Sequence, residues 1–358
     1  MKYFLFFFTF FFQLEAYCLS QQSKIEGMLV GAFYGDAYSG PFEFMKHPSQ
    51  NLKLSDYTSL ASPFRTFQDY AKAGNVTDDS RHKIIFIKSL VENLERTSVE
   101  NIASAYIAEY RKKDQYSELR TKWLDQFYNL SLFQVDPKHS RARDINLFFS
   151  GTPTLLGHMI FSPLAAIYPA QQKRAYHHCW EINFFDLSSA KDINCSIIAA
   201  LSTLLDEEPK DFNDFFASLV SYDHWSLSKI PYVGRPLYNY LKAMMEMLEK
   251  TKNKSDHRFL KSLSRFVNAK YWWEDYAGLI VTLAILHRTN ETPEKALPLI
   301  NLFGKDSDSY SQLAGAILGA IHGPDFFPRE DVIILKKSLI EQESFDFDKT
   351  FKRLYESK

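Results

Sequence analysis

The chain has 358 residues, with 42 Lys+Arg against 43 Asp+Glu, and 46% of its residues are hydrophobic. These are values of a globular protein, so they exclude a disordered chain, a collagen-like fibre and a disulfide-rich miniprotein. The formal net charge of −1 also argues against a nucleic-acid-binding protein, which needs a strongly basic surface.

The chain begins with Lys2 and a largely apolar run at residues 4–12. A bilayer span needs about 20 apolar residues, whereas a short apolar run behind a positive start is typical of a secretory signal peptide. We therefore expect residues 1–20 to be a cleaved signal peptide and residues 21–358 to form a secreted, or otherwise extracytoplasmic, protein without a membrane span. Cys179 and Cys195 can pair in an oxidising compartment, although the sequence leaves their pairing open.

From residue 23 onward, apolar residues recur with the 3.6-residue period of a helix and seldom alternate as they do in a strand. This pattern predicts an all-α protein with a single large helical domain from about residue 23 to about residue 335, followed by a short charged tail helix. The clearest helical faces lie at residues 84–94, 204–220 with a break at Pro209, 237–248 and 279–286.

Two further stretches carry glycine at every fourth position, which places three glycines on one face of a helix. Glycine disfavours a helix by roughly 1 kcal/mol relative to alanine, so its repeated use needs a reason. A face without side chains lets another backbone approach closely, and tight packing alone is one explanation. The two stripes are Gly27, Gly31 and Gly35, and Gly315, Gly319 and Gly323.

Acidic residues gather at the ends of these stripes and at a third helix start. Asp36 follows the first stripe, and two helix starts each supply a pair of carboxylates and a hydroxyl, where a helix cap needs one acceptor. Such anions repel each other unless water or a cation neutralises them, and Mg²⁺ prefers oxygen ligands. Two ions can share a carboxylate there and hold a water and a sugar hydroxyl, with helix capping as the alternative. The six residues are Thr77, Asp78 and Asp79, and Asp306, Asp308 and Ser309.

Taken in order, these motifs resemble those of the ADP-ribosylglycohydrolase family. Residues 31–43 (GAFYGDAYSGPFE) resemble its first motif, in which Glu43 follows Asp36 by seven residues. Residues 76–80 (VTDDS) resemble its Thr-Asp-Asp-Thr motif, and residues 157–168 (GHMIFSPLAAIY) resemble its central segment. Residues 304–323 (GKDSDSYSQLAGAILGAIHG) resemble its C-terminal Gly-x-Asp-x-Asp-Thr signature with the helix that follows.

The resemblance implies an orthogonal helical domain with a binuclear metal cleft that holds two Mg²⁺ ions, with Mn²⁺ as a possible substitute. The implied reaction is hydrolysis of an ADP-ribosyl or related ribosyl bond, in a small molecule or an ADP-ribosylated protein, by a monomer. The implied metal ligands are Thr77, Asp78, Asp79, Asp306, Asp308 and Ser309. The resemblance also implies roles in catalysis for Glu43, Asp78, Asp79 and Asp306, and contact with substrate for Asp36, Gly157 and His158, with the last two near phosphate.

Two segments depart from the family pattern. Ile160 stands where the family often has arginine, and residues 182–194 (INFFDLSSAKDIN) lack the histidine of its Thr-His stretch. Two alternatives therefore stay open: a non-catalytic protein that binds an ADP-ribose-type ligand on the same fold, and a hydrolase of a different glycoside. We interpret His177 and His178 as structural, because adjacent helical residues point about 100° apart, and residues 272–276 as core.

Overall fold

The computed structural model describes residues 19–43, 73–111, 118–139, 156–186, 188–229, 235–267 and 276–356. In these ranges the secondary structure consists of α-helices and short 3₁₀ turns without a β-strand, which confirms the predicted all-α fold. None of the described helices is long and apolar enough to cross a bilayer. The predicted signal peptide up to residue 18, and residues 272–275 of the aromatic cluster, lie outside the described residues.

The predicted apolar faces correspond to helices α2 (Asp78–Asn93), α9 (Pro236–Thr251) and α11 (Ala277–Thr289). Pro209 lies in the break between α7 (Ser188–Leu204) and α8 (Phe212–Ser221). The tail is more than one helix, because α14 and α15 both follow Pro328 and α15 buries Phe347 and Phe351 in the core. In chain order the helices are α1 (Gln21–Ser39), α2 (Asp78–Asn93), α3 (Val99–Arg111), α4 (Glu118–Val135), α5 (Leu156–Phe161), α6 (Gln172–Ile182), α7 (Ser188–Leu204), α8 (Phe212–Ser221), α9 (Pro236–Thr251), α10 (Asp256–Phe266), α11 (Ala277–Thr289), α12 (Pro293–Phe303), α13 (Ser307–His322), α14 (Arg329–Glu343) and α15 (Phe347–Glu356).

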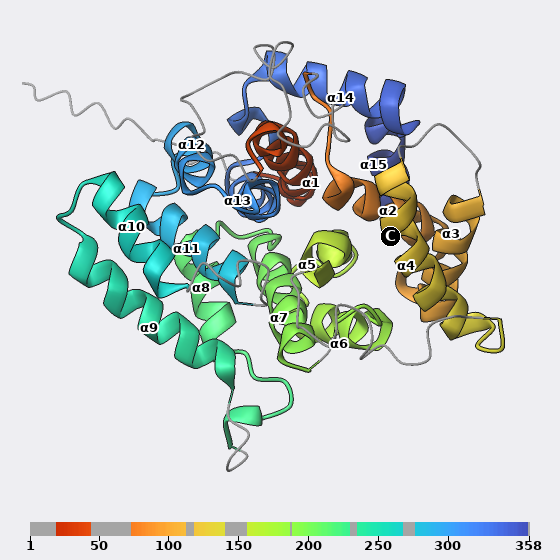
Figure 1. Ribbon diagram of the computed structural model, residues 1–358, viewed down its shortest axis with the longest axis horizontal. Helices are drawn as coiled ribbons and strands as arrows, with labels where there is room; N and C mark the ends of the chain where they lie inside the picture. The colour runs from red at the N-terminus through yellow and green to blue at the C-terminus, as the bar shows by residue number, and fades with distance from the viewer. Residues whose placement is uncertain are drawn as a thin grey trace, which may run out of the picture.

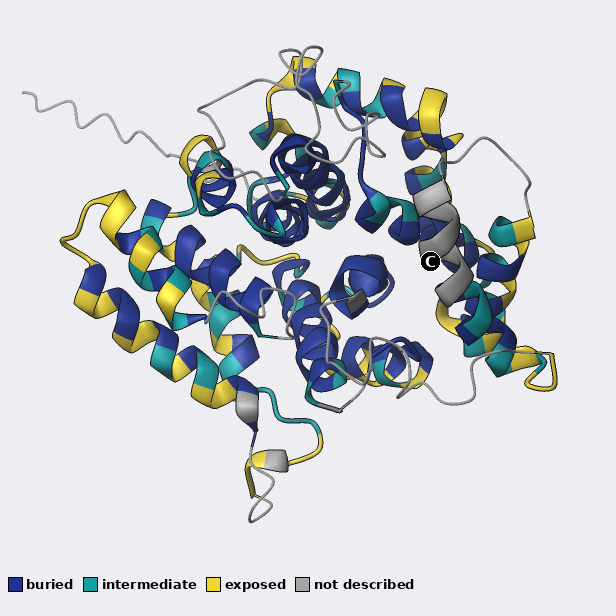
Figure 2. Cartoon of the chain, in the orientation of Figure 1, coloured by how far each residue is buried: buried dark blue, intermediate teal, exposed yellow. Residues whose placement is uncertain are grey.

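Helices α1 and α13 lie side by side at the centre of the molecule (Figure 1), and both are dark blue, hence buried, along most of their length in Figure 2. Their glycine stripes face each other: a Cβ atom added to Gly31 would lie 2.0 Å from the carbonyl oxygen of Gly315. Gly27 lies against Gly319 in the same way, so the two helices run in opposite directions. The stripes therefore pair two antiparallel helices at backbone contact.

Serines continue this register where the glycines end. Gly35 lies against the backbone of Ser311, and the hydroxyl oxygens of Ser39 and Ser311 are 2.6 Å apart. The hydroxyl of Ser307 donates to the carbonyl oxygen of Ser39 over 3.2 Å. This antiparallel pairing brings the C-terminal end of α1 to the N-terminal end of α13, where the acidic motifs of both helices lie.

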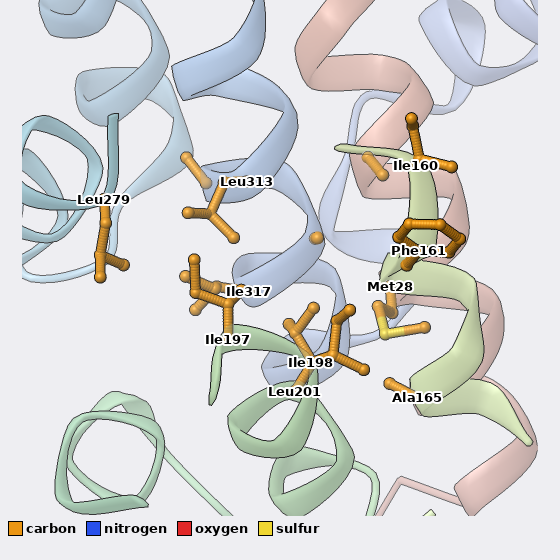
Figure 3. Packing of buried hydrophobic residues seen from close by; sticks show 14 of the residues in the cluster. Met28, Ile160, Phe161, Ala165, Ile197, Ile198, Leu201, Leu279, Leu313 and Ile317 are labelled. Carbon is orange, nitrogen blue, oxygen red and sulfur yellow. The ribbon is translucent and has the colours of Figure 1, made fainter. Parts of the chain in front are cut away.

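The hydrophobic core surrounds this central pair, and Figure 3 shows one part of it. Side chains of α13 meet those of α7, while α5 and the following 3₁₀ turn η6 (Ser162–Ala166) contribute from another side. The labelled residues are each 2% exposed or less: Met28, Ile160, Phe161, Ala165, Ile197, Ile198, Leu201, Leu279, Leu313 and Ile317.

A disulfide between Cys179 and Cys195 joins α6 to α7, with the two Cα atoms 5.5 Å apart. The two cysteines, whose pairing the sequence leaves open, are thus bonded to each other. His178, beside it, is buried; its Nε2 atom donates to the carbonyl oxygen of Thr97 over 2.6 Å, and its Nδ1 atom lies 3.0 Å from the hydroxyl oxygen of Tyr168. The structural interpretation of this histidine is thus confirmed.

Replacing both disulfide cysteines by alanine should lower the free energy of unfolding by about 3 kcal/mol, because the cross-link restricts the unfolded chain. The two cysteines are 16 residues apart, a loop length for which this effect is substantial. Urea denaturation of the wild type and the double variant measures the difference. Denaturation of the wild type under reducing conditions is the control and should reproduce the variant. A loss well below 1 kcal/mol would contradict the prediction.

Candidate metal centre

The first acidic residue of the centre, Asp36, holds the start of α2. Its carboxylate accepts hydrogen bonds from the backbone N–H of Thr77 at 3.1 and 3.2 Å and from that of Ser80 at 3.2 Å. A carboxylate at this position satisfies N–H groups that a helix start leaves without partners. Burial raises the pKa of Asp36 to about 6. The structure thus gives Asp36 a positioning role, and its predicted contact with substrate stays a prediction.

The Thr-Asp-Asp-Ser motif forms the first turn of α2. Thr77 occupies the N-cap, where its hydroxyl accepts from the Asp79 N–H over 3.3 Å. The Thr77 hydroxyl and the Asp36 carboxylate therefore cap the helix start, and the carboxylates of Asp78 and Asp79 are not needed for it. This observation weighs against capping as the reason for the acidic pair.

The second acidic motif begins α13. Gly304, with a φ of 73°, lies in the left-handed region and ends α12, so the chain can turn into the next helix. Asp306 is the N-cap residue of α13 but makes no capping hydrogen bond through its side chain. Ser309 donates from its hydroxyl to Oδ2 of Asp79 over 2.6 Å, which joins the two motifs. The two helix starts that the sequence singled out therefore meet in space.

Five carboxylates form two groups that share Asp308. Ligand atoms of Glu43, Asp306 and Asp308 lie within 4.8 Å of one another, and so do those of Asp78, Asp79 and Asp308. Oδ1 of Asp308 is buried and has no hydrogen-bond partner among the described residues. A buried carboxylate oxygen without a partner is unfavourable, so this atom has the character of a ligand for a cation.

Burial and mutual repulsion raise the pKa values of this centre well above their usual range. For Asp79 and Asp308 the largest cause is burial, followed by the charge of another carboxylate of the centre, and the same holds for Glu43 and Asp306. Divalent cations with a preference for oxygen would neutralise these charges together. The donor set therefore fits the metal ions that the sequence predicted, and no histidine or cysteine belongs to either group.

Gly157 and His158, predicted to lie near phosphate, belong to a separate buried polar cluster. The backbone N–H of Gly157 donates to Asp186, and a Cβ atom on Gly157 would lie 1.9 Å from Oδ2 of that carboxylate. Asn183 and Asn194 donate their Nδ2 atoms to Oδ2 of Asp186 over 2.6 and 2.7 Å. His158 Nδ1 lies 3.2 Å from Oδ1 of Asn194. Contact of Gly157 or His158 with a phosphate stays a prediction.

The polar cluster around Asp186 predicts a pH effect on stability. Burial is the main cause that raises the pKa of Asp186 from 3.8 to about 6. The protonated form is favoured in the folded state, so the contribution to stability is present below pH 4 and is lost as the pH rises through 6. Asp186→Asn should remove this dependence, which corresponds to about 3 kcal/mol.

Chemical denaturation of the wild type and Asp186→Asn at pH 4 and pH 8 measures this effect. The difference between the two proteins cancels titration of other groups, which both contain. We expect the wild type to lose about 3 kcal/mol more than the variant over this interval. Equal losses would show that Asp186 has an ordinary pKa in the folded protein.

Fold and site together define the class: an all-helical protein with a buried acidic centre suited to divalent cations. A family model described as ADP-ribosylglycohydrolase matches residues 18–352. The chain belongs to the ADP-ribosylglycohydrolase family, as its motifs predicted. Membership indicates a hydrolase of glycosidic bonds.

Solved structures give the same fold. Matches extend to 28 chains, among them one described as an ADP-ribosylglycohydrolase-related protein complex. That chain is 14% identical, with a TM-score of 0.63, over 94% of this chain and 98% of its own length. At this identity the likeness shows the fold alone. No curated protein matches the chain.

Proposed function

We propose that this protein is a divalent-metal-dependent hydrolase that cleaves an ADP-ribosyl or related ribosyl glycosidic bond, with Mg²⁺ as the metal and Mn²⁺ as a substitute. The observation that carries the proposal is the pair of carboxylate groups that share Asp308. Family membership supplies the reaction class, and the acidic centre supplies ligands for two ions.

Asp78, Asp79, Asp306 and Asp308 would hold the ions, and Asp308 belongs to both carboxylate groups. When bound, two such ions supply Lewis acidity that activates a water and orients the ribose hydroxyls. The protein keeps its own ligands in place: Asp36 fixes the start of α2, and Ser309 fixes the carboxylate of Asp79 by a hydrogen bond. Thr77 caps the same helix start.

The exposure of the acids indicates the side from which substrate approaches. Glu43, Asp78 and Asp306 are partly exposed, whereas Asp79 and Asp308 are buried. Glu43 therefore lies at the open side of the centre, where burial and the charges of Asp308 and Asp306 raise its pKa. The protonated form of Glu43 would donate its proton to the glycosidic oxygen or nitrogen as the bond to ribose breaks.

The test is calorimetric titration of the protein with Mg²⁺, and then with ADP-ribose in the presence and absence of Mg²⁺. We expect Mg²⁺ to bind and ADP-ribose to bind only with it, and we expect release of ADP-ribose from a modified peptide. Metal binding without ADP-ribose binding would redirect the substrate search to other glycosides. Absence of Mg²⁺ binding would overturn the proposal.

A second substrate class is favoured by the carboxylate beside Gly157. The N–H of this glycine already donates to Asp186, and an ionised carboxylate repels phosphate. A riboside without a diphosphate is thus the second candidate. Hydrolysis of a simple chromogenic riboside, compared with release of ADP-ribose from a modified peptide, separates the two classes.

We also propose that the protein acts outside the cytoplasm as a monomer. The disulfide between Cys179 and Cys195 supports this location, because such bonds persist in oxidising compartments. N-terminal sequencing of the protein from the secreted fraction should begin near residue 21, as the predicted signal peptide requires. Light scattering of the purified protein should give the mass of one chain.

A further inference from the structure

A buried lysine, Lys83, lies on the same helix as Asp78 and Asp79 of the acidic centre. Lys83 follows Asp79 by four residues on α2, so the two side chains share a face of the helix. The side chain of Lys83 is 1% exposed, and its Nζ atom donates to the hydroxyl of Ser162 over 3.0 Å. Lysine is seldom fully buried without compensation, because removing its charge from water is unfavourable.

The acids that compensate this lysine belong to the metal centre. Asp36 and Asp79 are the carboxylates whose charges act on Lys83 and raise its pKa, while burial lowers it to about 7. Both are buried, whereas Glu43 and Asp306 are partly exposed. Lys83 is therefore influenced by buried acids of the centre, whereas the partly exposed Glu43 and Asp306 are not among the charges that shift its pKa.

We propose that Lys83 is a built-in counter-ion of the metal centre, a positioning residue that offsets the charge of Asp36 and Asp79 and lowers the affinity of the site for divalent cations. The proposal rests on the proposed function, since it takes the acidic centre as the metal site. A fixed positive charge close to a cation site repels the incoming ion, and the interaction is strong in a buried environment. Ser162 holds this charge in place from η6.

The charges of the centre show why such a counter-ion matters. The five grouped carboxylates and Asp36 are all buried or partly buried. The pKa values of Asp36, Glu43, Asp79, Asp306 and Asp308 are raised, and the charge of Asp78 contributes to raising them. Among the described residues, the two carboxylate groups contain no positive charge that would offset this repulsion without a cation. In its protonated form Lys83 supplies one positive charge in the metal-free protein, which offsets part of this repulsion.

The test compares two neutral variants with one that keeps the charge. Lys83→Met and Lys83→Gln should bind Mg²⁺ about tenfold more tightly than the wild type in calorimetric titration. Lys83→Arg should bind it as the wild type does. Glutamine can still donate to Ser162, so Lys83→Gln separates the loss of charge from the loss of the hydrogen bond, and it serves if Lys83→Met does not fold.

A matched control is Lys24→Met. Lys24 is also a buried lysine, but its Nζ atom donates to the carbonyl oxygens of Asp206 and Glu208, and it lies at the other end of α1 from Asp36. This variant should leave Mg²⁺ affinity unchanged. If Lys24→Met also bound Mg²⁺ more tightly than the wild type, the proposal would be overturned, because tighter binding would then be a general effect of removing a buried charge.

The outcomes distinguish this proposal from the proposed function. If the wild type binds Mg²⁺ and the neutral Lys83 variants bind it equally well or more weakly, the counter-ion role is wrong and the metal site stands. If only the neutral variants bind Mg²⁺, Lys83 is confirmed as a counter-ion, and the proposal that the wild type is a metal-dependent hydrolase is wrong. If none of these proteins binds Mg²⁺, both proposals are wrong.

Discussion

Asp308→Asn is expected to abolish binding of divalent cations and to stabilise the metal-free protein. Asp308 belongs to both carboxylate groups, so its loss removes a ligand from each proposed ion. Glycosidic activity should fall by about a thousandfold or more, which corresponds to the several kcal/mol that metal ions contribute to such reactions. Calorimetric titration with Mg²⁺ and a hydrolysis assay measure these losses.

The gain in stability follows from the same carboxylate. Burial and the charges of Asp306 and Asp36 raise the pKa of Asp308, so its ionised form destabilises the folded protein at neutral pH. An uncharged amide of the same shape should raise the free energy of unfolding in EDTA by about 1–2 kcal/mol. Glu330→Gln, an exposed acid in the first turn of α14, is the control and should change neither property. Unchanged Mg²⁺ affinity in Asp308→Asn would refute the shared-ligand assignment.

Gly31→Ala is expected to destabilise the protein by about 3 kcal/mol or more, although alanine is the better helix former by about 1 kcal/mol. The added Cβ atom would lie 2.0 Å from the carbonyl oxygen of Gly315 and 2.8 Å from Cζ of Phe327. Helices α1 and α13 would have to move apart. Urea denaturation measures the loss of stability.

The same substitution should weaken Mg²⁺ binding, because the helix pair sets the separation between Asp308 and Asp36, which holds the start of α2. Gln22→Ala, on the exposed side of α1, provides the matched control and should leave both stability and binding nearly unchanged. A stabilised Gly31→Ala variant would mean that helix propensity outweighs packing and that the two backbones are not in contact.

These two predictions rest on features that were visible in the sequence to different degrees. The four-residue glycine spacing predicted close approach of a backbone, but spacing on one helix does not identify the partner helix. Only the structure shows that Gly31 meets Gly315 and that the pairing is antiparallel. The acidic motifs were predicted to meet, whereas the choice of Asp308 as the shared carboxylate depends on atomic positions.

Other features left no usable signal in the sequence. Lys83 lies in a helix segment that contains charged neighbours, so its burial depends on the contact with Ser162 from a distant segment. Residues of the cluster around Asp186 lie in the stretch 182–194. In the sequence this stretch differs from the family pattern by a missing histidine, and nothing in it predicts that Asn183 and Asn194 both contact Asp186. Helical periodicity predicts each helix separately, whereas these contacts join residues from several helices. The metal ions, the substrate, the signal peptide and the oligomeric state stay predictions.

The pairing of α1 with α13 also has a consequence for the order in which the protein forms. Gly31 and Gly315 come from opposite ends of the chain, and the acidic centre combines residues 36–43 and 77–79 with residues 306–308. Contacts between such distant residues form late, because a long loop must close before they gain stability. A growing chain therefore lacks a complete acidic centre until residues 306–308 have emerged, and the proposed metal ions could bind there only after that point.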